Sequence, residues 1–312
     1  MPTAPTVSAI VIFLNEERFL CEAIQSVLAQ TTDDWELLLV DDGSTDASSA
    51  IARSFAARFP DQIRYLEHPQ HANLGMSASR NLGIECALGR FVALLDADDV
   101  WLPHKLESQK ELLDARPEAG MVYGRSRYWF SWSGRPEDIK RDFIPMTGVP
   151  SGTLVQPPSL LPTFLSGKAV VPCPSSLLIR RDLLLQVGGF EAQFTGMYED
   201  QAFFAKFVLF HPVCVVDTCW SFYRQHATAT TALARKANTE IEARRAFLTW
   251  LKSYLVEQRV KDETLWRVLQ EESWLLEIPH GVPVGLQRYV RWVRKWLLRS
   301  GLCPKANEPG RG

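Results

Sequence analysis

Three carboxylates lie close together in the stretch LLDADDVW, which runs from Leu94 to Trp101. Asp96, Asp98 and Asp99 directly follow a short apolar run, and in open α/β sheets ligands bind at the carboxyl ends of strands. Acids at this spacing repel one another unless a cation or hydrogen bonds intervene. Mg²⁺ or Mn²⁺ commonly takes one or two carboxylates together with phosphate oxygens. The stretch therefore predicts a divalent-metal site, with an acidic turn of solvated side chains as the alternative.

A second pair of acids, Asp41 and Asp42, closes another apolar run. A carboxylate at a strand end accepts hydrogen bonds from a nucleobase imide or a ribose hydroxyl. The alternative is an Asx turn that only starts the next helix, and it fits Asp41 better than Asp42.

Two other stretches of the chain contain basic residues that are candidates for the site. Arg80 lies in the Gly- and Ser-containing stretch from Asn73 to Asn81, and a guanidinium binds oxyanions through its fixed fork of donors. A solvated helix face is the alternative for Arg80. In SFYRQH, Arg224 is suited to phosphate and His226 to Mn²⁺, because imidazole is an acceptable ligand of that ion. A plain surface histidine is the alternative for His226.

Composition limits the kinds of protein that the chain could be. Its 312 residues, 46% of them hydrophobic, are enough for one core of about 200 to 250 residues and an appendage. A net charge of −2 gives no general reason to expect nucleic-acid binding. The six cysteines form no C-x-x-C pair, which favours reduced thiols in the cytoplasm. We see no signal peptide and no apolar run near the roughly 20 residues that cross a bilayer, although contact with a membrane surface stays open.

The first half of the chain alternates strand and helix patterns, which predicts a doubly wound, mostly parallel α/β sheet with its site at the strand carboxyl ends. Asn15 is expected to cap the first helix, and Asp99 to cap the helix that Pro103 opens. The expected strands are Val7 to Leu14, Trp35 to Val40, Ile63 to Leu66 and Phe91 to Leu95, and the helices between them centre on residues 20–28, 51–55 and 74–87.

The second half is less regular. Eight prolines between Ser131 and Pro174 predict a long irregular stretch, of a kind that is usually functional. Strand and helix patterns return at 175–179, 181–187, 200–210 and 213–216, and beyond Thr231 only helices are expected. We therefore divide the chain into a catalytic domain, residues 1–230, and a helical extension, residues 231–312.

Five motifs then occur in a fixed order: VSAIVIFLNEERFL, ELLLVDDGSTD, NLGMSASRNLGI, LLDADDVWLPHKL, and VGGF followed by YEDQAFF. In order and spacing they resemble family 2 glycosyltransferases, over residues 7 to about 228. The resemblance implies an inverting enzyme with the GT-A fold that needs Mn²⁺ or Mg²⁺. It implies transfer of a sugar from a nucleotide-sugar donor, a UDP-sugar by preference, to a hydroxyl of a glycan or lipid-linked acceptor in cell-surface polysaccharide synthesis.

The resemblance also implies residue roles. Asp200 corresponds to the catalytic base, which takes the proton of the acceptor hydroxyl, while Glu199 orients it. An acid placed there only to favour a helix N-terminus is the alternative. Asp98 corresponds to the metal ligand, with His226 as a second ligand. The residues expected to contact the donor are Phe13, Leu14, Glu16, Asp42, Arg80, Asp96, Ala97 and Arg224.

The chain departs from the family pattern at two of these motifs. The family usually places an aromatic residue before the Asn of its first strand, where this chain has Leu14. Leucine buries area without stacking, and Phe13 points to the opposite face of the strand. Ser79 stands where the family has alanine. The first departure weakens the expected packing on the nucleobase.

Two other functions remain as alternatives. A sugar-1-phosphate nucleotidyltransferase would carry a Gly-rich, basic loop after the first strand, and Asn15, Glu16 and Glu17 provide neither feature. A non-catalytic, glycan-binding relative of a transferase would be expected to lose one of its carboxylates, yet Asp98 and Asp200 are both present.

The carboxyl-terminal tail has its own pattern. From residue 283 onward seven basic residues oppose one acid, 7 − 1 = +6, and apolar residues including Trp292 and Trp296 recur at helical spacing. Such a helix could lie on an anionic membrane. Packing on the catalytic domain with a solvated basic face is the alternative.

Overall fold

A computed structural model describes residues 4–277. One nine-stranded sheet runs through it in the order β3-β2-β1-β4-β8-β6-β9-β5, and β7 pairs with β9. The strands are β1 (Val7–Phe13), β2 (Trp35–Asp41), β3 (Ile63–Glu67), β4 (Phe91–Asp96), β5 (Val100–Trp101), β6 (Met121–Trp129), β7 (Thr153–Val155), β8 (Leu177–Arg180) and β9 (Val213–Arg224).

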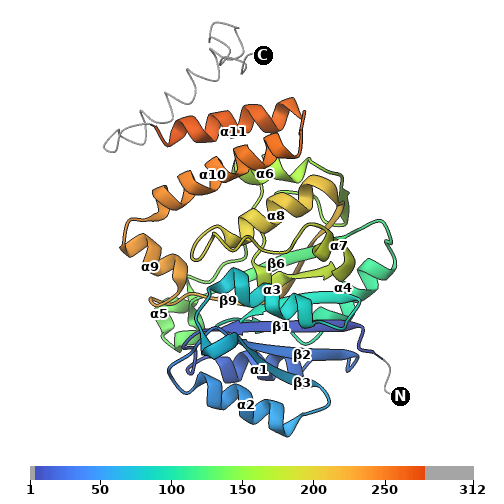
Figure 1. Ribbon diagram of the computed structural model, residues 1–312, viewed down its shortest axis with the longest axis vertical. Helices are drawn as coiled ribbons and strands as arrows, with labels where there is room; N and C mark the ends of the chain where they lie inside the picture. The colour runs from blue at the N-terminus through green and yellow to red at the C-terminus, as the bar shows by residue number, and fades with distance from the viewer. Residues whose placement is uncertain (1–3, 278–312) are drawn as a thin grey trace, which may run out of the picture.

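Helices cover both faces of this sheet (Figure 1). They are α1 (Leu20–Leu28), α2 (Ser48–Arg58), α3 (Met76–Cys86), α4 (Lys105–Asp114), α5 (Pro136–Ile139), α6 (Leu160–Leu165), α7 (Arg181–Gln186), α8 (Glu199–Phe210), α9 (Thr230–Lys236), α10 (Glu240–Glu257) and α11 (Glu263–Leu275). Three short 3₁₀ turns complete the description: η1 (Pro69–His71), η2 (Ser131–Ser133) and η3 (Pro174–Ser176). The predicted α/β class is confirmed.

The strands β3, β2, β1 and β4 form a parallel core. Every residue of β1 and β2 is buried, as continuous apolar runs in a sheet covered on both faces require. Their register pairs Phe13 with Asp41 and Ile12 with Asp96. The carboxyl ends of the three central strands therefore meet at one edge of the sheet, which brings the expected acids together.

Beyond β4 the sheet is mixed. β8 runs antiparallel to β4 and β6, whereas β6 and β9 are parallel. We did not predict β5 or β6, and β9 extends well past the expected end at Val216, as far as Arg224. Between β6 and β8 the proline-rich stretch contains only short elements, as its composition predicted. Residues expected at the site therefore come from both the parallel half and the mixed half of the sheet.

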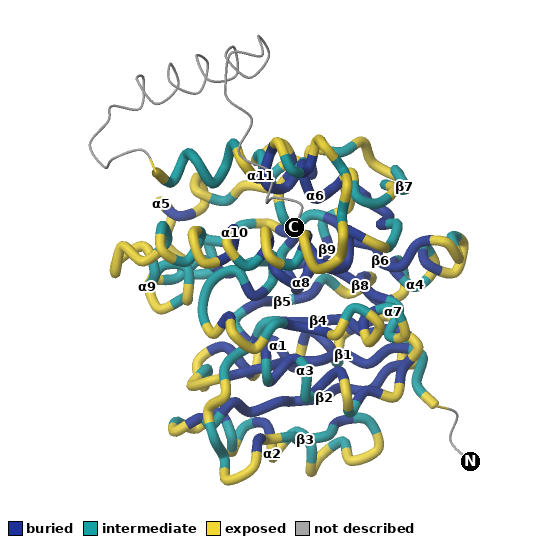
Figure 2. Tube along the Cα trace, turned by 45° about the horizontal axis from the view of Figure 1, so that its top comes forward, coloured by how far each residue is buried: buried dark blue, intermediate teal, exposed yellow. Residues whose placement is uncertain are grey.

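Two apolar clusters hold the layers together. Alternate residues of β1 point to opposite faces, so Ile10 and Ile12 join one cluster while Val11 and Phe13 join the other. Figure 2 shows the resulting buried strands between helices whose outer sides are exposed. Five described cysteines, at positions 21, 86, 173, 214 and 219, are free thiols.

The helices after β9 belong to the same core. Buried residues of α10 and α11, including Phe247, Leu251 and Leu265, pack in the cluster that contains Leu94 of β4. The boundary that we placed at residue 230 stays a prediction, and the tail from residue 283 lies outside the described residues. Within residues 4–277, none of the helices combines the length and apolar character needed to cross a membrane.

Candidate active site

The turn after β4 is held in place by its third acid. The amide of Asp99 donates to the carbonyl of Asp96 (3.0 Å). The buried carboxyl of Asp99 accepts hydrogen bonds from the Ser175 hydroxyl (2.6 Å) and the Arg224 amide (2.9 Å). Burial, and then the charges of Asp98 and Asp96, raise the pKa of Asp99 well above its usual value. The expected capping role was wrong: Asp99 joins β4 to η3 and β9 and does not cap α4.

Asp98 and His226 meet at this edge although they are 128 positions apart. His226 Nε2 lies 2.9 Å from Asp98 Oδ2, and the histidine ring packs on Phe19 with 5.0 Å between centroids. The Arg224 guanidinium donates to the Asp98 carbonyl (2.6 Å) and fixes the peptide beneath the carboxylate. One carboxylate oxygen and one imidazole nitrogen thus converge on a single point, a donor set that suits Mn²⁺.

Glu16 lies in the loop after β1, near enough to Asp98 and His226 for their charges to act on its carboxyl. Burial and then the charge of Asp98 raise the pKa of Glu16 to about 7, while the charge of His226 lowers it. The Glu16 amide donates to the Ser48 hydroxyl (2.8 Å), which fixes this loop against α2. Glu16 therefore belongs to the group of acids at the carboxyl edge of the sheet.

Cys173 forms a second group of candidate metal ligands with Asp96 and Asp99. Their ligand atoms all lie within 4.8 Å of one another. Asp96 and Asp99 are already engaged by Arg80 and Ser175, and burial raises the pKa of the Cys173 thiol well above its usual value. The pair Asp98 and His226 is therefore the better fit to a divalent cation.

Arg80 connects the turn after β4 to helix α8. Its guanidinium donates to Asp96 Oδ1 (2.7 Å) and to Glu199 Oε1 (3.0 Å), and it stacks over the Phe190 ring at 5.1 Å. Arg80 is only 2% exposed, so the solvated helix face that we considered as an alternative is wrong. The contact with Glu199 spans 119 positions and was not predicted.

Asp200 lies in the first turn of α8, next to Glu199. Its Oδ1 accepts a hydrogen bond from the Gln201 amide (2.7 Å), and its side chain is partly buried. Burial and then the charge of Glu199 raise the pKa of Asp200 to about 7. A carboxylate with this pKa can exchange a proton near neutral pH, which is the property of a general base.

Asp42 holds the loop that leads into α3. Its Oδ1 accepts from the amides of Leu74 (2.8 Å) and Gly75 (3.0 Å), and His68 Nε2 lies 3.7 Å away. Gly75 has φ +89°, a conformation that a residue with a side chain rarely adopts. Asp41, in contrast, accepts from the Ser44 amide (2.8 Å), which is three residues on and therefore one residue beyond the spacing of an Asx turn.

The residues at the end of β1 differ in their exposure to solvent. Leu14 is exposed, whereas Phe13 is buried in the cluster with Val11 and Leu39. Phe13 therefore contributes its carbonyl, which accepts from the Asp42 amide (2.9 Å), and its ring does not reach the edge. Asn15 does not cap α1; its Oδ1 accepts from the Thr45 amide (2.7 Å) and ties the first two loops together. Ala97 is buried in the turn after β4.

Aromatic side chains enclose Arg224. Its guanidinium lies 4.6 Å from the Phe19 ring centroid and 4.5 Å from that of Trp129, and it pairs with Glu22 (2.6 Å). Trp132 closes the group and donates from Nε1 to the Gln225 carbonyl (2.9 Å). We did not predict these aromatic partners, although the run YWFSW at 128–132 carried the signal. Arg224 is thus fully engaged by protein groups.

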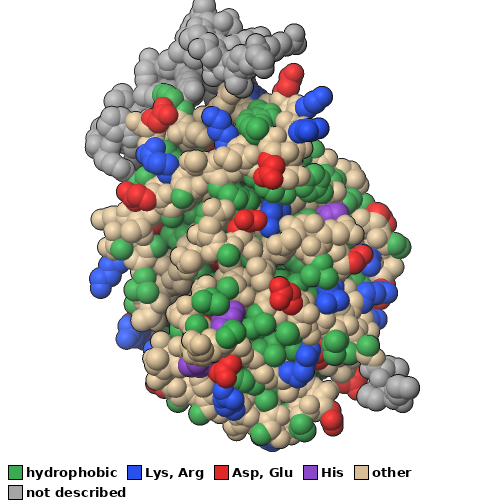
Figure 3. Space-filling model, in the orientation of Figure 1, with side chains coloured by type: hydrophobic (Ala, Val, Ile, Leu, Met, Phe, Trp, Pro, Cys, Tyr) green, Lys and Arg blue, Asp and Glu red, His purple; other side chains and the backbone are tan. Residues whose placement is uncertain are grey.

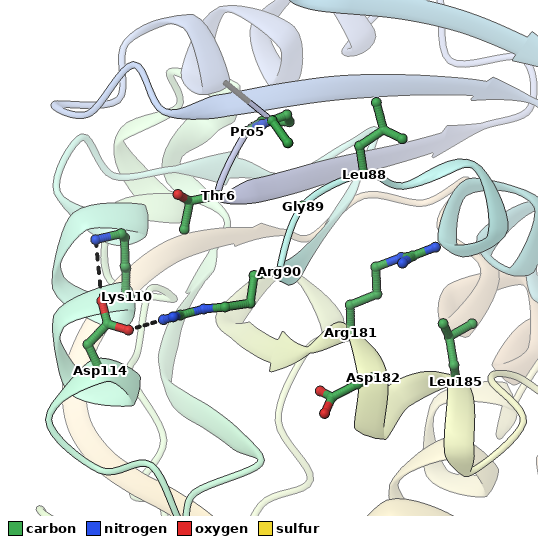
Figure 4. Close-up of a pocket in the computed structure, with 11 residues that line it drawn as sticks. Pro5, Thr6, Leu88, Gly89, Arg90, Lys110, Asp114, Arg181, Asp182 and Leu185 are labelled. Carbon is green, nitrogen blue, oxygen red and sulfur yellow. Dashed lines mark hydrogen bonds and ion pairs between the residues drawn. The ribbon is translucent and has the colours of Figure 1, made fainter. Parts of the chain in front are cut away.

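A cavity lies elsewhere on the molecule. It measures about 600 Å³ and opens at the amino ends of β1 and β4, beside Thr6 and Arg90. Figure 4 shows Arg90 and Lys110 reaching Asp114, with Arg181 on the opposite wall. None of the residues expected to do chemistry lines this cavity.

Comparisons with known proteins identify the family of the chain. The model of the family described as glycosyl transferase family 2 matches residues 8–188. An uncharacterized glycosyltransferase of Nostoc sp. is 41% identical over 117 residues, which is 38% of this chain and 35% of the relative. The chain thus spans about a third of the length of this curated relative.

Solved structures share the fold. S. aureus TarS 1–349 in complex with UDP-GlcNAc superimposes with a TM-score of 0.63 and 18% identity, covering 93% of this chain and 79% of TarS. The mannosyltransferase PcManGT of Pyrobaculum calidifontis, in complex with GDP-Man and Mn²⁺, gives 0.61 and 18%, covering 98% and 77%. These likenesses confirm the expected GT-A fold, and the match over residues 8–188 shows that this chain belongs to glycosyltransferase family 2.

Proposed function

We propose that this chain is a metal-dependent, inverting glycosyltransferase. It moves a sugar from a nucleotide-sugar donor, a UDP-sugar by preference, to a hydroxyl of a glycan or lipid-linked acceptor in cell-surface polysaccharide synthesis. The observation that carries the proposal is the Arg80 bridge. Through it the acids that follow β4 and the acid at the start of α8 form one site, with Asp96 and Glu199 bound to the same guanidinium.

The donor is expected along the carboxyl ends of β1, β2 and β4. Asp42 retains acceptor capacity on Oδ2, which receives one hydrogen bond from Gly75 (3.0 Å), and is expected to face the nucleobase. Leu14 is exposed beside it. Because the ring of Phe13 is buried, we expect weaker stacking on the base than an aromatic residue at position 14 would give. The complexes of TarS with UDP-GlcNAc and of PcManGT with GDP-Man support a nucleotide-sugar as the donor class.

Asp98 and His226 would hold Mn²⁺ or Mg²⁺. The two side chains are 2.9 Å apart, and together with the nearby Glu16 carboxyl they offer the oxygen and nitrogen ligands that such ions bind. When bound, the ion would stabilise the negative charge that develops on the leaving nucleotide. Arg224 would act indirectly, because its guanidinium fixes the Asp98 carbonyl and is itself paired with Glu22.

Asp200 would act as the base. The acceptor oxygen bonds to the anomeric carbon as the bond to the donor phosphate oxygen breaks, and the acceptor proton moves to the Asp200 carboxylate. Attack from the face opposite the leaving group inverts the configuration. The raised pKa makes Asp200 a stronger base than a solvated aspartate, and Arg80 positions the neighbouring Glu199. Asp96 is expected to contact the donor sugar or ribose beside the same arginine.

Membership of family 2 favours this reaction over the nucleotidyltransferase alternative. Measurable turnover of a donor would distinguish an enzyme from a non-catalytic relative. A panel of nucleotide sugars incubated with the full chain and Mn²⁺ tests both points, with the melting temperature and the slow release of free sugar as readouts. We expect one donor to stabilise the protein and to be hydrolysed slowly. Stabilisation without any hydrolysis or transfer would favour the glycan-binding relative.

A further inference from the structure

The segment after β6 exposes apolar side chains beside the site. Ile139 is 64% exposed, Phe143 50%, Ile144 38% and Met146 75%. Single exposed apolar residues are common, but four within eight positions are unusual for a surface in contact only with water. We call this set, together with the exposed Arg127, Arg135, Lys140 and Arg141, the apolar–basic surface.

This segment is anchored to the domain. Phe143 stacks on Tyr128 with 4.6 Å between ring centroids, and the Tyr128 amide donates to the Phe143 carbonyl (2.9 Å). At its start, the Trp132 indole donates to the Gln225 carbonyl (2.9 Å) and packs edge-on against Phe19. The exposed apolar side chains are therefore presented by a fixed backbone.

The segment carries a small surplus of positive charge. Over residues 127–146 four basic residues oppose three acids, 4 − 3 = +1. Two of these acids turn inward: Asp138 accepts from the Ser133 hydroxyl (2.7 Å), and Asp142 accepts from the Phe130 amide (2.7 Å). Glu137 is the acid of this segment that is exposed. Asp138 also pairs with Arg141 (2.7 Å), and Asp142 lies 4.0 Å from Arg127, so the surplus of positive charge in this segment comes from Arg135 and Lys140.

The segment that carries the apolar–basic surface begins beside the candidate site. Trp132 approaches His226 with 6.4 Å between ring centroids, and His226 contacts Asp98. Figures 1 and 2 both place α5 and α9 on the same side of the molecule, and Leu233 of α9 is a further exposed apolar residue there. Figure 3 shows no field of one charge sign on the face it presents, where acids and bases are mixed.

We propose that the apolar–basic surface binds an anionic membrane. Apolar side chains interleaved with cations match the boundary between anionic headgroups and acyl chains, where area burial and electrostatic attraction add. The inference rests on the proposed function in one respect, because it assigns the acceptor to the lipid-linked class. A membrane seated on Ile139 and Met146 would present the headgroup of such an acceptor to the site that contains Asp98 and Asp200.

Vesicle co-sedimentation of the full chain tests the proposal. We expect binding to vesicles that contain phosphatidylglycerol, weak binding to phosphatidylcholine alone, and release at high salt. The double variant Ile139→Ser with Met146→Ser should bind about tenfold more weakly or worse, because it removes two apolar side chains from the interface. Arg135→Glu with Lys140→Glu should bind more weakly to the anionic vesicles in particular.

The matched control is Leu88→Ser with Val256→Ser, two residues that are 62% and 63% exposed elsewhere on the molecule. It should bind like the wild type. All variants keep the basic tail, so a difference between them belongs to the apolar–basic surface. Equal binding of the Ile139/Met146 variant and the wild type would overturn the proposal.

Hydrolysis of a soluble nucleotide sugar separates this proposal from the proposed function. A chain that hydrolyses the donor but does not bind anionic vesicles would overturn the membrane proposal alone. A chain that binds vesicles as expected, and loses that binding in the Ile139/Met146 variant, supports the surface even if no donor is turned over.

Discussion

The two ends of β1 and β4 hold their charged side chains in different ways. At the carboxyl ends Arg80 is buried and shared between Asp96 and Glu199. At the amino ends Arg90 pairs with Asp114 in solvent, and their side chains are 57% and 40% exposed. Burying a charge costs several kcal/mol unless it is paired and hydrogen-bonded, whereas a surface pair costs and contributes little.

This difference separates the candidate site from the cavity at the other end of the sheet. The cavity of about 600 Å³ lies at the amino ends, where the pairs are exposed. The raised pKa values of Glu16 and Asp200 lie at the carboxyl ends, where burial and neighbouring acids disfavour ionisation. Buried charge with shifted pKa values is typical of functional sites. None of the acids that the sequence predicted at strand ends lines the cavity at the amino ends.

The largest expected effect comes from removing the buried cation. Arg80→Met leaves Asp96 and Glu199 without their shared partner and should lower the free energy of unfolding by about 3–5 kcal/mol. Arg90→Met, at the other end of the sheet, should change it by about 0.5 kcal/mol or less. Denaturant unfolding of the two variants measures both values. Similar losses in the two variants would contradict the contrast between the two ends.

Much of the carboxyl edge could be predicted from sequence, because its residues follow strands directly. Asp42, Asp96 and Asp98 lie at strand ends, and parallel register brings such ends together. The partners of these acids could not be predicted in the same way. Glu199, Ser175 and Trp132 come from segments far along the chain, and no local pattern states which acid or ring they will meet.

The mixed half of the sheet was also poorly predicted. β6 carries arginines and ends in aromatic residues, so it lacks the continuous apolar run that marks a buried parallel strand. Phe13 shows the opposite case, since strand alternation correctly indicated that its ring points away from the face of Leu14. Local periodicity therefore predicted the strands that are buried along their whole length. It failed for a strand such as β6, which is buried in one part and exposed in another.

The next effect concerns catalysis at the carboxyl edge. Asp200→Asn should keep donor binding and reduce sugar transfer by roughly 10²-fold or more, because it removes the group that accepts the proton. Steady-state transfer and donor-dependent melting shifts measure the two properties. Asp182→Asn, an exposed acid beside the cavity at the amino ends, is the matched control and should retain wild-type transfer. Wild-type turnover in Asp200→Asn would contradict the base assignment.

A smaller effect appears in the pH dependence of stability. The pKa of Asp200 is about 7 in the folded chain and 3.8 for an ordinary aspartate. Between these values the unfolded chain loses its proton first, so the contribution of Asp200 to stability falls as pH rises from about 4 to 7. Asp200→Asn removes this loss and should therefore melt a few degrees above the wild type at pH 8. Each kcal/mol of added stability corresponds to about 2–4 °C in melting temperature. The difference should vanish near pH 4.

Transfer by the wild type should change with pH in the complementary direction. The base acts as a carboxylate, so the rate should fall by about tenfold per pH unit below the pKa of about 7. A pH profile of transfer at saturating donor measures this. A rate that stays flat between pH 5 and pH 8 would show that no group with a raised pKa takes the proton.

The most direct test of the metal-dependent donor site is the melting temperature of the full chain with UDP, with and without Mn²⁺. At a concentration 100 times the dissociation constant, a ligand stabilises the native state by about 2.7 kcal/mol, which corresponds to roughly 5 °C or more. We predict this shift only when UDP and Mn²⁺ are present together, and its loss in Asp98→Ala. An equal shift in Asp98→Ala, or an equal shift without the metal, would contradict the assignment of the site.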